Sequence, residues 1–232
     1  HPHPFAYVMP TDAEWRCEKP QPTLEEIVPG TLYRVPTYFT NGASPFWQQV
    51  FATIVRLHSG KLVIINPVAL PAPIAQSIRE LGQVSHLVTP VKFHSRYIAE
   101  NQALFPEART IGVRGHRVNP PSMSLRFDGF LDDRAPLFPE DFDQVGVAGH
   151  ELEETVFFHR ATRTAVFQDL LFANRAAVSG APFWWRLYAL IFGIHDEVTL
   201  PAYQTLLWTN VLALRGSVAR LGPPQPVEWI DG

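Results

Sequence analysis

Apolar and β-branched residues first gather in three short runs, which cover Thr31 to Val35, Phe46 to Leu57 and Lys61 to Ile65. Runs of this length with turn residues between them are typical of strands. His58-Ser59-Gly60 separates the last two runs and has the composition of a hairpin turn. The pattern therefore predicts an antiparallel meander over residues 31–65.

In the segment after the meander, apolar residues recur at helical spacing. Ile74, Ile78 and Leu81 fall on one helical face, and Gly82 stands where a glycine in the left-handed conformation commonly ends a helix. The elements expected after this helix are a strand over 85–89, a second helix over 95–105 and a strand over 110–113. The chain thus predicts an αβαβ segment after the meander.

The second half repeats this order. Residues 115–140 are rich in proline and predict loops, where substrate specificity often lies. Expected strands then cover 144–147, 154–158 and 164–167, and expected helices cover 184–192 and 201–221. The sequence therefore predicts two blocks of strands, each followed by helices.

Composition supports one globular core, because 46% of the 232 residues are hydrophobic and 18% are charged. Six prolines among the first thirty residues favour an extended arm over residues 1–27, followed by a single domain over 28–232. The formal net charge is −3 and lysine and arginine are scattered, which argues against a nucleic-acid partner.

The sequence says less about the cellular location of the protein and about its oligomeric state. Cys17 is the only cysteine, so an intramolecular disulfide is excluded; this favours the cytoplasm, with a secreted protein that needs no disulfide as the alternative. The longest apolar runs are interrupted by polar residues and predict no membrane span. The aromatic stretch from Phe183 to Phe192 suits core packing, a ligand pocket or a homodimer contact.

Two β blocks with flanking helices predict two sheets packed face to face with helices outside. Over residues 28–215 the sequence resembles the metallo-β-lactamase superfamily. The segment from Ile27 to Tyr33 is similar to its opening strand, and the segment from Leu57 to Pro67 is similar to its first hairpin, with Asn66 where the family has aspartate. The resemblance implies an α/β fold, the αββα four-layer sandwich.

The family's main metal motif, His-x-His-x-Asp-His, is largely missing. The corresponding loop runs from Thr89 to His94, and only His94 matches. Gly149-His150 resembles the next ligand turn, and Gln168-Asp169 resembles the family's Gly-Asp. The resemblance implies one Zn or Fe ion on His94, His150 and Asp169, with His195 as the only late candidate for the family's last ligand.

Each of these three residues also has an ordinary structural explanation. His94 can cap a helix, His150 can donate to a loop carbonyl, and Asp169 can accept backbone amides. The remaining histidines considered, His58, His116 and His159, fall in predicted turns and loops and are expected to be exposed.

Three charged residues near His94 are candidate catalytic groups. Lys92 and Arg96 can hold an anionic group of a substrate, and Glu100, like Glu151 beside His150, can act as a general base if it faces the same cleft. Solvated surface charge is the competing explanation for all of them. The sequence has no glycine-rich nucleotide loop and no nucleophile elbow.

The sequence therefore favours a metal-dependent, hydrolase-like enzyme that acts on a small molecule. Two alternatives remain open. One is a metal-free relative that binds a small ligand or catalyses with Lys92, Arg96 and Glu100; the other is a non-haem iron redox enzyme.

Overall fold

A computed structural model describes residues 21–39, 48–131, 135–170, 207–220 and 228–231, together with Phe183, Leu187 and Ile191. Most of the predicted arm, including Cys17, lies outside the described residues, as do His195 and most of the helix expected over 184–192. No helix in the described part of the chain is long and apolar enough to cross a bilayer.

The first sheet has seven strands in the order β1 to β7. They are β1 (Glu25–Val28), β2 (Leu32–Phe39), β3 (Gln48–Arg56), β4 (Leu62–Ile65), β5 (Val84–Thr89), β6 (Arg109–Gly112) and β7 (Gly129–Phe130). Strands β1 to β4 pair antiparallel, which confirms the predicted meander, and β4 to β7 pair parallel.

Helices α1 (Ala72–Leu81) and α2 (Ile98–Leu104) connect the parallel strands. Ala75 and Ile78 of α1 pack with Ile64 and Leu87 of the sheet in one buried cluster. Helix α1 ends at Leu81 as predicted, but the expected left-handed glycine is wrong, because Gly82 has φ 160° and ψ −180° and leaves the helix in an extended conformation.

The segment predicted as loops contains more structure than expected. A short 3₁₀ helix covers Arg114–Arg117, and β7 adds two residues to the sheet edge. The nearby Gly112 is required by packing, because a Cβ there would lie 2.6 Å from the Phe127 ring. Aromatic packing against β6 thus orders a segment that has no periodic pattern.

The second sheet has the order β11-β10-β9-β8. Strands β8 (Phe142–Gly146), β9 (Thr155–His159) and β10 (Thr164–Phe167) pair antiparallel and confirm the second predicted block. The sequence did not predict β11 (Glu228–Asp231), which pairs parallel with β10. Helix α4 spans Val211–Arg220 and confirms that part of the helix predicted over 201–221. Residues 201–206 lie outside the described residues, and Trp208, just before α4, forms a β-bridge with His150.

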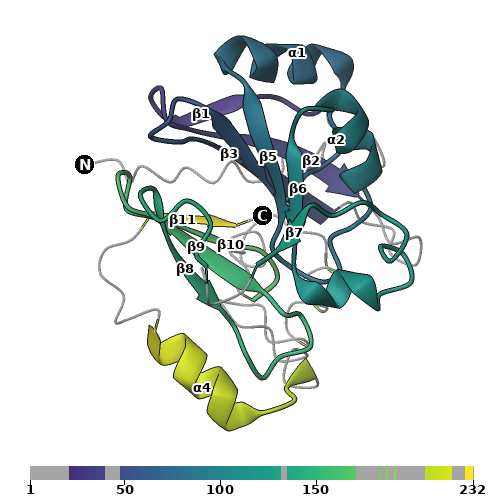
Figure 1. Cartoon of the computed structure of the whole chain (residues 1–232), viewed down its shortest axis with the longest axis vertical. Helices are drawn as coiled ribbons and strands as arrows, with labels where there is room; N and C mark the ends of the chain where they lie inside the picture. Colours follow the sequence, from purple (N-terminus) through teal and green to yellow (C-terminus); the bar gives the residue numbers. More distant parts are fainter. Residues whose placement is uncertain are drawn as a thin grey trace.

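Two buried clusters define the remaining layers. Leu32, Val63 and Ile111 of the first sheet pack with Phe142 and Phe157 of the second. The other face of the second sheet packs against Leu214 of α4. Figure 1 shows α1 and α2 outside one sheet and α4 outside the other. The chain is therefore an αββα sandwich, as predicted.

Candidate functional site

His94 and Asn66 form the first contact of the candidate site. Asn66 ends β4 with φ 58°, a conformation that asparagine tolerates better than most residues. Its Nδ2 donates to the backbone oxygen of Phe51 at 2.7 Å, so its Oδ1 faces His94 Nδ1 at 2.8 Å. Because a carbonyl oxygen only accepts, this chain of contacts requires a proton on His94 Nδ1.

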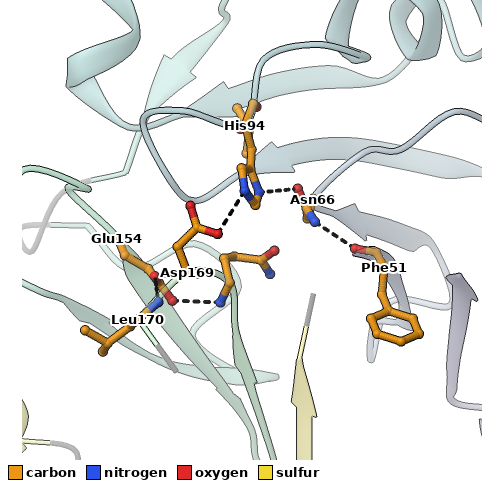
Figure 2. A network of polar contacts seen from close by, with 8 residues as sticks. Phe51, Asn66, His94, Glu154, Asp169 and Leu170 are labelled. Atoms are coloured by element: carbon orange, nitrogen blue, oxygen red, sulfur yellow. Dashed lines mark hydrogen bonds and ion pairs between the residues drawn. The ribbon is translucent and has the colours of Figure 1, made fainter. Parts of the chain in front are cut away.

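Asp169 holds the other ring nitrogen of His94. Its Oδ1 lies 3.1 Å from Nε2, and the two side chains are 26% and 23% exposed, so a small ligand can reach the pair. Figure 2 shows the imidazole between Asp169 and Asn66. Since both nitrogens face acceptors, the geometry suits a doubly protonated, cationic ring.

Electrostatics support the same charge state. Burial lowers the pKa of His94, but the charge and hydrogen bond of Asp169, with the charge of Glu154, outweigh burial and raise that pKa above its ordinary value of 6.5. The histidine therefore stays cationic to higher pH than a free imidazole.

Glu154 fixes the turn that carries Asp169. Its buried carboxylate accepts hydrogen bonds from the backbone nitrogens of Gln168 at 2.8 Å, Asp169 at 3.0 Å and Leu170 at 2.6 Å. Burial and the charge of Asp169 raise the pKa of Glu154 to about 7, against the opposing effect of the three amides. Glu154 was not among the residues predicted from the sequence, although a carboxylate at the start of an apolar strand is a pattern that could have indicated it.

A second histidine supports the loop from behind. Thr89 Oγ1 donates to the backbone oxygen of His94 at 2.6 Å, so at 3.2 Å it accepts from His116 Nε2. His116 Nδ1 lies 3.0 Å from Ser122 Oγ. Burial, with the nearby charge of His94, lowers the pKa of His116 to about 4, so the ring is neutral at pH 7.

The expected exposure of three histidines is correct only for His58. His116 and His159 are 0% and 1% exposed. His116 stacks on Phe127, and His159 packs at a tilt against Phe142, its partner across the β8–β9 pair, so aromatic side chains cover both rings.

His150 occupies a tight turn rather than an open loop. Leu152 donates its backbone N–H to His150 Nδ1 at 3.2 Å, and the imidazole is buried. Gly149 has φ 79°, and a Cβ there would lie 2.1 Å from the backbone oxygen of Asn210. Glycine is therefore required for this turn to dock beside α4.

The residues brought together do not fit a metal ion well. His94 and Asp169 are in direct contact, but in the described ranges no group of three or more histidine, cysteine, aspartate or glutamate side chains is placed to hold a metal. A catalytic zinc takes three protein ligands, and His195, the late candidate from the sequence, lies outside the described residues, so the described pair by itself does not make up such a set. The set of His94, His150 and Asp169 stays a prediction.

The three candidate catalytic residues, Lys92, Arg96 and Glu100, do not gather at one site in the structure. Arg96 lines a cavity next to His94. Lys92 pairs with Glu151 at 3.1 Å and lies 5.6 Å from the centre of the Phe93 ring. Glu100 is exposed in the first turn of α2. Their catalytic roles stay predictions, and of the three only Arg96 lines this cavity.

The cavity has a volume of about 220 Å³. It is walled mainly by apolar and aromatic groups and carries two cationic side chains and one amide; its lining residues are Val50, Asn66, Pro67, Val68, Phe93, His94, Arg96 and Tyr97. Apolar walls with a few polar groups are typical of small-molecule sites. This volume suits a ligand smaller than most drugs.

Comparison with solved structures identifies the fold. The chain is similar to DIM-1 metallo-β-lactamase exposed to ceftazidime, with a TM-score of 0.56 and 11% identity over 86% of this chain and 100% of that one. It is also similar to the metallo-β-lactamases from Pontibacter korlensis (TM-score 0.54, 11% identity, 84% and 99% covered) and Hirschia baltica (TM-score 0.54, 8% identity, 89% and 100% covered).

The chain therefore has the metallo-β-lactamase fold in a highly diverged sequence. No protein-family model and no curated protein matches it. At this level of identity the similarity defines the fold, and the chemistry must be argued from the site.

Proposed function

We propose that this protein binds a small organic anion with an apolar body, and that it does so without a metal ion. The observation that carries the proposal is the pair of hydrogen bonds that holds both ring nitrogens of His94. A fixed imidazolium adds positive charge to the wall of an apolar cavity. Both of its N–H groups are already used by Asn66 and Asp169, so hydrogen bonds to a bound anion must come from another cation of the lining.

Arg96 supplies a second cation on the cavity wall. A guanidinium binds carboxylate or phosphate through two parallel hydrogen bonds. Phe93 and Tyr97 add aromatic surface for the apolar part of the ligand. The occupant that satisfies this lining is a small aromatic or branched carboxylate.

A binding titration tests the charge requirement. Calorimetry with benzoate and with benzamide, its neutral counterpart, should show benzoate binding about tenfold more tightly or better, the size of one charge-assisted hydrogen bond. Arg96→Met should remove most of this preference, whereas Arg215→Met, an exposed arginine of α4 outside the cavity, should leave it unchanged. Equal affinity for the two probes would overturn the proposal.

The same pair of residues supports a second function, hydrolysis without metal. Asp169 is a quarter exposed beside a cationic histidine, so it can accept a proton from water as the water oxygen attacks the acyl carbon. It can then pass that proton to the leaving group, while the charge of His94 offsets that of the carboxylate. The bond broken is then the acyl bond of a small ester or amide. Turnover of small carboxylate esters that is lost in Asp169→Asn and unaffected by a chelator would support this function.

A further inference from the structure

We propose that Glu154 is a positioning residue of this site: its carboxylate binds three successive backbone amides and thereby directs Asp169 at His94. The role of Glu154 in directing Asp169 is argued from geometry alone. The importance of the His94 charge rests on the proposed function, which this inference deepens.

The contacts of Glu154 show why the turn has one conformation. Oε1 accepts from Gln168, and Oε2 accepts from both Asp169 and Leu170, at 2.6 to 3.0 Å. Three consecutive N–H groups that converge on one carboxylate leave the turn after β10 little freedom to rotate. Figure 2 shows Glu154 below Asp169 on the side away from Asn66.

The position of Glu154 is itself anchored. Its backbone oxygen accepts from Val147 at 2.7 Å, and the next residue, Thr155, donates its backbone N–H to Pro90 in the loop that leads to His94. One short segment therefore connects the turn of Asp169 with the loop of His94. A shift at Glu154 changes both partners of the pair.

The three backbone amides explain an acceptor at this position, and the charge of that acceptor has a further consequence for Asp169. Glu154 is 1% exposed and lies close enough to Asp169 that the two negative charges oppose each other. A buried carboxylate beside another carboxylate is costly, and a neutral side chain would avoid that cost. A carboxylate at this position is explained if the exact direction of Asp169 matters.

The test is a double-mutant cycle on Glu154→Gln and Asp169→Asn. Glutamine keeps the size of the side chain but replaces one acceptor with an NH₂ group that faces backbone donors. Each single variant should weaken benzoate binding by about tenfold, and the double variant should be no weaker than Asp169→Asn alone. Independent, multiplying losses would overturn the positioning role, because general destabilisation acts whether or not Asp169 is present.

A readout without ligand separates failure of this inference from failure of the proposed function. Nitrogen-15 NMR of the His94 imidazole should show Nε2–H hydrogen-bonded to Asp169 in the wild type and loss of this hydrogen bond in Glu154→Gln. The two proteins are compared at pH 5, where Glu154 is protonated and its charge no longer raises the pKa of His94. If the wild type binds no benzoate but the NMR change occurs, the positioning role stands and the ligand class is wrong. An unchanged His94 spectrum in folded Glu154→Gln contradicts the inference. Arg160→Gln, an exposed change on the same sheet, is the control.

Discussion

His94 Nε2 lies 3.1 Å from Asp169 Oδ1, although one residue follows β5 of the first sheet and the other follows β10 of the second. The contact joins the two halves of the sandwich at one edge. It also brings two of the three candidate metal ligands into direct contact. The central question about this protein is what lies between these two side chains.

Replacing Asp169 with asparagine should lower the pKa of His94, because it removes the charge that outweighs burial. The folded pKa is raised, so the stabilisation from the pair is present below pH 6.5 and is lost as pH rises through the folded value. An NMR titration of His94 measures the change. A pKa that stays above 6.5 in Asp169→Asn would contradict this electrostatic account.

Glu154 should make the protein less stable as pH rises. Its pKa is about 7 in the folded state against an ordinary 4.5, so the folded protein holds a proton that the unfolded chain loses between these values. The free energy of unfolding should fall between pH 4.5 and 7 by up to about 3 kcal/mol, a slope absent from Glu154→Gln. Urea unfolding at several pH values checks this, and equal slopes in both proteins would contradict it.

His116 should make the protein more stable as pH rises, the opposite of the effect of Glu154. Its pKa is about 4 in the folded state against an ordinary 6.5, so its contribution to stability is present above pH 6.5 and is lost as pH falls toward 4. His116→Gln should flatten the fall in stability over that window. His58→Gln, at an exposed hairpin position, serves as the control and should leave the curve unchanged.

Gly149→Ala should disrupt the docking of the His150 turn on the segment before α4. The added Cβ would lie 2.1 Å from one backbone atom and 2.8 Å from another, and the φ of 79° is itself unfavourable for alanine. A loss of at least about 2 kcal/mol in unfolding free energy is expected. Gly216→Ala in α4 meets no atom within 4 Å and should instead be neutral or stabilising.

The sequence predicts the fold of this protein better than it predicts the site. The apolar spacing of Ile74 and Ile78 and the β-branched runs of the two meanders are local signals, and they gave the layers correctly. Strand β11 and the burial of His116 depend on partners far away in the chain, β10 for the strand and Thr89 for the histidine, which no local pattern encodes. The resemblance placed His94 and Asp169 at strand ends, but Glu154 emerged only from its three backbone contacts.

If His94 and Asp169 share a proton, as proposed, no metal ion lies between them. Elemental analysis by mass spectrometry on protein without a polyhistidine tag, after exposure to Zn and to Fe(II), measures this directly. The account predicts far less than one metal ion per chain, with no difference between the wild type and a His94→Ala, His150→Ala double variant. Near-stoichiometric metal in the wild type that is lost in the double variant would contradict the account and support the metal set of His94, His150 and Asp169.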